Sequence, residues 1–176
     1  MKRIAWTALF LILFLTYFLS SIPGLQVVPV FRQINSALVM FDFSLTALAA
    51  KIAARLPEQL DPAKSAASQF YQLALTNPDM TEYLLRKSAH VILFFFISIA
   101  FFLLLRQYLR SPVNALFGAA ALATLTACLD EFYQSFVAFR SGSITDVFID
   151  LIGVTLAFFF IAFALFITGR SASAKS

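Results

Sequence analysis

Four long apolar runs divide the chain, and most of its polar and charged residues gather between them. The runs cover residues 4–21, 87–105, 113–129 and 147–168. Crossing the hydrocarbon core of a bilayer takes roughly 20 predominantly apolar residues in a helix. A helix also satisfies its own backbone polar groups in lipid, where no water is present to do so. The pattern therefore predicts an all-α integral membrane protein, a four-span helical bundle that forms one membrane domain.

The first run follows Lys2 and Arg3 directly, which is also the position of a secretory signal peptide. Its apolar stretch is long for a signal peptide, and no small-x-small cleavage site follows it. We therefore expect residues 1–21 to form a retained N-terminal membrane span.

The long segment between the first two runs, residues 22–85, allows two interpretations. Residues 33–56 are apolar enough for a fifth span, but Asp42 stands in the middle and Lys51 and Arg55 follow near the end. A helix lying in the membrane interface fits this mixture better, and a fifth span would invert every later segment. We expect residues 22–85 to be an outer interfacial helical segment that hugs the membrane. Asn77-Pro78 predicts the start of a helix that runs on into the second span.

The basic residues predict the orientation of the spans. Six of them lie in the short segments on one side, and the short loop on the other side holds only Arg140. The six are Lys2, Arg3, Arg106, Arg110, Arg170 and Lys175. Because short cytoplasmic segments are enriched in Lys and Arg, we expect both termini in the cytoplasm, with residues 169–176 as a cytoplasmic tail. All nine acidic residues then fall on the outer half.

The composition agrees with a membrane protein and excludes other classes. Hydrophobic residues make up 61% of the chain and charged residues only 12%, whereas soluble domains carry about 25% charge. The net charge of +4 comes from basic residues that are not clustered on a soluble face, so no nucleic-acid partner is expected. The single cysteine, Cys128, excludes an internal disulfide.

Ionisable and amide side chains recur at the outer ends of three predicted spans and in one loop. They are Lys87, His90, Asp130, Glu131, Gln134, Arg140, Asp146 and Asp150. Several of them stand three or four residues apart, which places them on a common helix face. If the spans pack as one bundle, the whole group meets at one depth. We predict a polar site there, with a network that only fixes the packing of the bundle as the rival hypothesis.

The connection between the last two spans supports a site that is removed from water. Residues 132–140 are too apolar for an exposed loop and predict a partly inserted hairpin or an interfacial segment over the acids. Thr145 is then the predicted cap of the last helix. The four acids of the site face two cations, Lys87 and Arg140, which leaves a formal balance of −2. A bound cation, a protonated carboxyl group or a protonated His90 would offset it.

The spacing of possible metal ligands gives only a weak indication. His90 and the carboxylates form a reasonable ligand set, but no H-x-x-x-H or H-E-x-x-H spacing occurs in the sequence. The sequence therefore leaves open whether a metal or another cofactor binds.

Two motifs resemble the VanZ-like family of bacterial membrane proteins. They are "RKSAHVILFFFISIAF" and "LDEFYQSFVAFRSGSITDVFIDLIGV", which lie within residues 86–160. They carry a K-x-x-H at Lys87 and His90, a D-E-x-x-Q at Asp130, Glu131 and Gln134, and an R-x-G-x-x-x-D that ends at Asp146. The family usually has Asn four residues later, where this chain has Asp150. The resemblance makes residues 86–168 a VanZ-like core of three spans.

The resemblance implies a multi-pass protein of the bacterial cytoplasmic (inner) membrane. The namesake of the family is associated with low-level teicoplanin resistance. We expect a protein that binds a lipid or a lipid-linked cell-envelope headgroup in the outer leaflet, with Lys87 and Arg140 on phosphate and the acids on hydroxyls or amines. The alternative is an intramembrane hydrolase or transferase on such a substrate, with His90 as general base and Glu131 or Asp130 orienting it. A transporter ranks third, because four spans are few and no pair of broken helices is evident.

Overall fold

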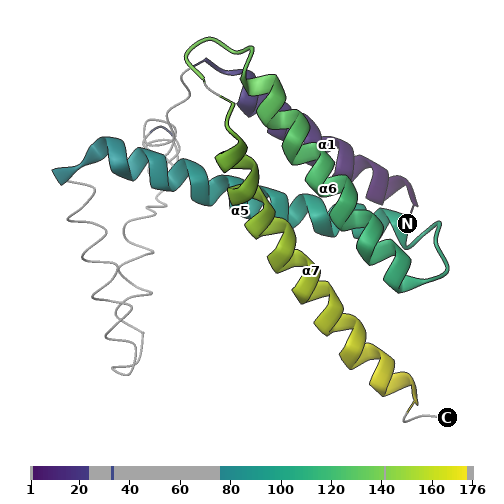
Figure 1. The fold of residues 1–176 in the computed structure, drawn as a ribbon. Helices are drawn as coiled ribbons and strands as arrows, with labels where there is room; N and C mark the ends of the chain where they lie inside the picture. The colour runs from purple at the N-terminus through teal and green to yellow at the C-terminus, as the bar shows by residue number, and fades with distance from the viewer. Residues whose placement is uncertain (1, 24–32, 34–75, 141, 174–176) are drawn as a thin grey trace. The chain divides into compact units, whose positions relative to one another are not determined.

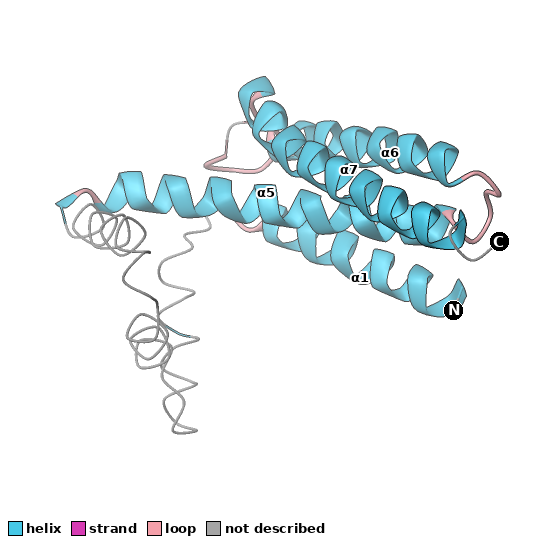
Figure 2. Cartoon of the chain, turned by 90° about the horizontal axis from the view of Figure 1, so that it is seen from below, coloured by secondary structure: helices cyan, strands magenta, loops and turns pink. Residues whose placement is uncertain are grey.

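Four helices make up most of the part of the chain that this computed structural model describes, residues 2–23, 33, 76–140 and 142–173. They are α1 (Lys2–Ser21), α5 (Pro78–Leu105), α6 (Pro112–Gln134) and α7 (Ile144–Ser173), and the described residues contain no strand (Figure 2). Each helix is long and apolar enough to cross a membrane, which confirms that the four predicted runs form helices of spanning length. The predicted interfacial segment lies almost entirely outside the described residues.

The start of α5 also agrees with the sequence. The helix begins at Pro78, and the backbone N–H of Thr81 donates a 3.1 Å hydrogen bond to the carbonyl of Asn77. Proline suits a first helical turn because its missing N–H would have no partner within the helix there. The chain divides into two compact units, residues 1–25 with 87–176, and residues 26–86.

The helices α6 and α7 both start after a serine. The Ser111 hydroxyl accepts a 3.3 Å hydrogen bond from the Asn114 N–H, and Pro112 follows as the first residue of α6. At α7 the carbonyl of Ser143 accepts the Asp146 N–H, and its hydroxyl accepts the Thr145 N–H. The prediction that Thr145 caps the last helix is therefore wrong: Ser143 precedes the helix and satisfies its first donors.

Consecutive spans run in alternating directions. The start of α1, the connection from α5 to α6 and the end of α7 lie at one end of the bundle (Figures 1 and 2). The connection from α6 to α7 lies at the opposite end. At the first end, Trp6 Nε1 donates to the Tyr108 hydroxyl at 3.0 Å, and Lys2 Nζ lies 4.9 Å from the centre of the Tyr108 ring. These contacts tie the start of α1 to the connection from α5 to α6.

A stripe of small residues lets α6 pack closely against its neighbours. Ala115, Ala119, Ala123 and Ala127 recur every four residues, and all four are buried. Without large side chains in between, helices in a membrane approach closely and gain van der Waals contact. We call this row of four residues the alanine stripe.

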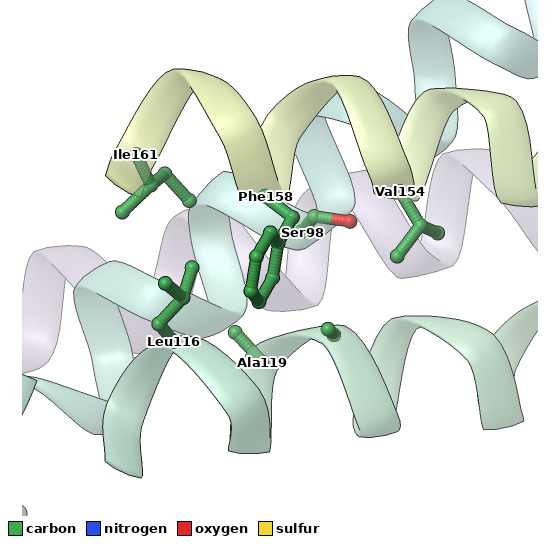
Figure 3. Close-up of a pocket in the computed structure, with 7 residues that line it drawn as sticks. Ser98, Leu116, Ala119, Val154, Phe158 and Ile161 are labelled. Atoms are coloured by element: carbon green, nitrogen blue, oxygen red, sulfur yellow. The ribbon is translucent and has the colours of Figure 1, made fainter. Parts of the chain in front are cut away.

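The centre of the bundle is dry and apolar. A crevice between α5, α6 and α7 is lined by Ser98, Leu116, Ala119, Ala120, Val154, Phe158 and Ile161 (Figure 3). It is too narrow to admit a water molecule, and its one hydroxyl, that of Ser98, donates to the Phe94 carbonyl at 2.8 Å. In Figure 3, Phe158 of α7 points toward Leu116 and Ala119 of α6. No polar group in this crevice therefore needs water or a ligand.

A glycine sets the crossing of α5 and α7. A Cβ atom at Gly153 would overlap the backbone carbonyl oxygen of Val91 and would lie 3.0 Å from the Phe95 nitrogen. The two backbones can touch here only because Gly153 has no side chain. His90 precedes Val91 directly, and Asp150 lies three residues before Gly153, so the close crossing also brings these two polar side chains together.

Outward-facing side chains of the bundle are large and apolar. On α1, Phe10, Phe14 and Phe18 are all more than half exposed, and successive rings stack at 6.3 and 6.0 Å. Such a row of exposed phenylalanines would be unfavourable in water and is favourable against lipid tails. The exposed face of α1 therefore agrees with a membrane-embedded bundle.

Candidate functional site

All eight polar residues singled out in the sequence lie at the end of the bundle where α6 connects to α7. We call them the polar cluster: Lys87, His90, Asp130, Glu131, Gln134, Arg140, Asp146 and Asp150. Asp130 and Asp150 are fully buried, and Glu131 and Gln134 are 4% and 5% exposed. Burial of this degree distinguishes the cluster from an ordinary set of helix ends in water, where acidic side chains remain hydrated.

Two polar side-chain contacts of the cluster join α5 to α7. Lys87 Nζ forms an ion pair with Asp146 Oδ2. One turn deeper, His90 Nδ1 lies 3.2 Å from Asp150 Oδ1. Lys87 and His90 are three residues apart on α5, and their partners Asp146 and Asp150 are four residues apart on α7. The two pairs therefore stack one above the other.

Gln134 joins α6 to α1 and to the loop. Its amide nitrogen donates to Asp130 Oδ2 at 2.7 Å and to the Ser20 hydroxyl at 3.3 Å. Its amide oxygen accepts from Arg140 Nη1 at 3.2 Å. Arg140 Nη2 in turn donates to the backbone carbonyl of Leu19 at 3.1 Å. The polar groups of three separate segments are therefore held in one hydrogen-bonded network.

The loop between α6 and α7 closes back on the end of α6. The Ser143 N–H donates to Glu131 Oε2 at 3.0 Å. A Cβ atom at Gly142 would overlap the backbone oxygen of Glu131, so the glycine permits this close approach. Phe139 adopts φ 60°, a left-handed conformation that is unfavourable for an aromatic residue, and the turn places Arg140 against α6 and α1.

The aromatic segment does not form the hairpin, which was one of its two predicted arrangements. Residues 132–134 still belong to α6, and residues 135–140 form consecutive turns instead of a hairpin. The side chains of Phe136 and Phe139 are 72% and 93% exposed. Asp130, Glu131 and Asp150 are buried as predicted, but the helices and the loop backbone cover them, because the two exposed rings do not. Exposed aromatic side chains at the end of a span are typical of the membrane–water interface.

Three side chains of the cluster lie close enough together to hold a metal ion. One possible ligand atom from each of His90, Asp130 and Glu131 lies within 4.8 Å of the other two. Asp130 Oδ1 and Asp150 Oδ2 are buried and have no hydrogen-bond partner among the described residues. Buried polar atoms without partners are uncommon in folded proteins, which makes these two oxygens candidate contacts for a ligand.

Sequence reasoning missed two residues of this site and assigned one partner differently. The Ser20 hydroxyl accepts from Gln134, and the Ser143 N–H donates to Glu131. Of these two contacts, only that of Ser20 could have been indicated by its position, at the end of the first apolar run. The carboxylate that bonds to His90 is Asp150, whereas the enzyme hypothesis gave this part to Glu131 or Asp130. Asp150 is the residue at which the chain departs from the usual Asn of the VanZ-like pattern.

The helices and the cluster together define a multi-pass helical membrane protein with a buried polar site at one end of its bundle. The family model described as VanZ/LLP1 matches residues 5–166, and the chain belongs to this family. The match therefore extends well beyond the motifs between residues 86 and 160 and includes α1. No curated protein and no solved structure matches the chain.

Proposed function

We propose that this VanZ-like protein binds a lipid or a lipid-linked cell-envelope headgroup at the polar cluster, in the outer leaflet of the bacterial inner membrane. The observation that carries the proposal is the convergence of eight polar side chains, four of them buried, at one end of an otherwise apolar bundle. Ionisable groups in membrane spans are costly and are retained chiefly where they serve a function. The apolar crevice at the centre of the bundle provides the contrast, since packing alone needs no such groups.

Two features fit an amphipathic ligand that approaches from the membrane. Arg140 is only partly buried and lies in the loop, and its guanidinium group, which donates to Gln134 and Leu19, is of the kind that binds phosphate groups in proteins. The exposed rings of Phe136 and Phe139 extend from the same loop and suit contact with the upper part of lipid chains. Lys87, already paired with Asp146, neutralises an acid that would otherwise repel a phosphate.

The binding proposal is tested by the lipid that the protein retains on purification. Wild-type protein, Arg140→Gln and Arg110→Gln are purified in mild detergent from the same bacterial host, and bound phospholipids and prenyl-phosphate lipids are measured by native mass spectrometry. Wild type and Arg110→Gln, whose altered residue lies at the opposite end of the bundle, are expected to retain about one lipid per chain. Arg140→Gln is expected to lose it. Equal retention by all three proteins would contradict the proposed site.

The resistance phenotype is tested in a teicoplanin-sensitive host at equal membrane abundance of each protein. Wild type is expected to raise the inhibitory concentration of teicoplanin, and His90→Ala and Glu131→Gln are expected to remove the protection. If both variants protect as well as wild type, the cluster has only a structural role in this assay.

One observation favours the second candidate, an intramembrane hydrolase or transferase with His90 as general base. Asp150 lies on Nδ1 of His90, and this leaves Nε2 as the atom that would take a proton, the arrangement that orients a catalytic histidine. Release of product from a prenyl-phosphate substrate by purified wild type, absent in His90→Ala, would establish this activity. Stable lipid retention without any product would exclude it for that substrate.

A further inference from the structure

We propose that His90, Asp130 and Glu131 bind a divalent transition-metal ion. The ion would lie within the cluster proposed for lipid binding, but its evidence and its test do not depend on a lipid. One ligand atom of each residue lies within 4.8 Å of the others. Ligand atoms around an ion with bonds of about 2.0–2.2 Å lie within about 4.4 Å of one another, so a small side-chain rotation completes the set.

The hydrogen bonds of the cluster leave one atom on each of the three residues for an ion. His90 uses Nδ1 for Asp150, Asp130 uses Oδ2 for Gln134, and Glu131 uses Oε2 for the Ser143 N–H. Nε2 of His90, Oδ1 of Asp130 and Oε1 of Glu131 remain. Asp130 is fully buried, and its Oδ1 has no partner among the described residues. An ion is the occupant that would satisfy this atom.

The partners of the three residues have the form that supports metal ligands in proteins. A metal-binding histidine almost always donates its second ring N–H to a carboxylate or carbonyl, which fixes the ring and its tautomer. Asp150 holds this position on His90. Gln134 donates to Asp130 and the Ser143 N–H donates to Glu131, so each of these hydrogen bonds fixes one carboxylate oxygen. The close crossing at Gly153 and the close approach at Gly142 maintain both arrangements through the backbone.

The charges of the cluster agree with a divalent cation. Lys87 pairs with Asp146, and among the described residues neither Asp130 nor Glu131 forms an ion pair with a lysine or an arginine. With Lys87 and Asp146 paired, Asp130, Glu131 and Asp150 stand against Arg140, and this formal balance of −2 matches the charge of one divalent ion. An imidazole with two carboxylates and no sulfur suits Zn²⁺, Mn²⁺ or Fe²⁺, whereas Mg²⁺ and Ca²⁺ prefer oxygen ligands alone. In this arrangement Nε2 of His90 is a metal ligand and not a general base.

The proposal is tested on the full chain, purified in detergent, stripped with a chelator and incubated with Zn²⁺ or Mn²⁺ alone. Metal content after desalting is measured by elemental mass spectrometry. Wild type and Asp79→Asn, which alters an exposed carboxylate in the first turn of α5, are expected to hold about one ion per chain. His90→Ala and Asp130→Asn are expected to lower the affinity at least tenfold, and Asp150→Asn by about 10- to 100-fold.

A second measurement on the wild-type protein does not depend on the folding of the variants. An ion that binds only the folded state raises the midpoint of thermal unfolding as its concentration increases. We expect Zn²⁺ or Mn²⁺ to raise the midpoint for wild type, and Mg²⁺ to have a much smaller effect. Absence of both bound metal and a stabilising effect in wild type would overturn the ion site, as would equal affinity in wild type and Asp130→Asn.

The two proposals for the cluster fail in different ways. Bound metal without retained lipid refutes the proposed lipid function and leaves the ion site in place. Retained lipid without bound metal refutes the ion site, and protonation then offsets the charge of the buried acids.

Discussion

The alanine stripe and the polar end of α6 belong to one continuous buried face of a single helix, yet they contact their neighbours through opposite chemistry. From Ala115 to Ala127 the face is made of methyl groups, and the helices around it meet in close, dry contact. The next residue in the four-residue repeat after Ala127 is Glu131, and Asp130 and Gln134 flank it. Here the face consists of carboxylates and an amide in a hydrogen-bonded network.

Along one helix, the difference separates packing that only stabilises the bundle from the part proposed to bind a ligand. Close packing of small residues is sufficient to associate helices in a membrane, and the stripe shows that α6 uses it. A buried carboxylate adds a desolvation cost that close packing does not have. The polar end therefore costs stability that a row of alanines would not, and proteins commonly accept such a cost where a site needs it.

The largest change in the free energy of unfolding is expected at Gly153, where α5 and α7 cross. Gly153→Ala would force a methyl group into the backbone of Val91, so α5 and α7 would have to separate, at a cost of at least about 2 kcal/mol in the free energy of unfolding. Separation would also break the contact between His90 and Asp150. Unfolding in detergent micelles, followed by circular dichroism, measures the loss.

Gly118→Ala is the matched control for this substitution. Its new methyl group would lie 3.0 Å from Leu105 Cδ1, the end of a side chain that can rotate away. We expect a change within about 1 kcal/mol, since alanine also favours the helix by about that amount. Equal losses for the two glycines would show that the close crossing at Val91 does not limit stability.

A smaller effect is expected within the alanine stripe. Ala123→Leu places three further carbon atoms in a fully buried position and is expected to lower the free energy of unfolding by about 1–3 kcal/mol. Ala121→Leu makes the same change on an exposed position of α6, and we expect an effect within about 0.5 kcal/mol. The same unfolding measurement compares them, and equal effects would mean that α6 does not pack through this face.

The smallest expected change is a gain in the free energy of unfolding, and it concerns the polar end of α6. Asp130→Asn removes a buried charge and keeps an oxygen that can accept from Gln134. We expect the metal-free protein to gain about 1 kcal/mol of stability while it loses the proposed ion. Unfolding of the chelator-treated proteins measures the gain. A clear loss of stability would instead make Asp130 a structural residue and would remove the contrast between the two regions.

The sequence predicted the class of fold closely because lipid constrains it so strongly. Each apolar run had to be a helix long enough to satisfy its own backbone across the bilayer, and the four helices appear where the runs do. The ends were less certain: α6 extends to Gln134 and α7 starts at Ile144, both beyond the apolar runs. Helix termini depend on individual capping contacts, such as those of Ser143, which hydropathy does not detect.

For the candidate site, helical spacing predicted which residues share a face but not which partner each one meets. It grouped Lys87 with His90 and Asp146 with Asp150, and these residues do face one another across α5 and α7. It could not assign Asp150 to His90, because that pairing depends on the depth at which two helices cross. Ser20 was missed for the same reason, since its contact with Gln134 joins residues that are 114 positions apart.

The sequence by itself determined a helical membrane protein with one group of ionisable residues near the same end of three spans, because hydropathy and helical periodicity are local properties of the chain. Only the tertiary structure decided that His90, Asp130 and Glu131 point at one another while Lys87 is paired with Asp146. The close approaches at Gly142 and Gly153 bring the loop and α7 to within contact of α6 and α5. Such contacts are fixed by the packing of separate segments, which no single stretch of sequence contains.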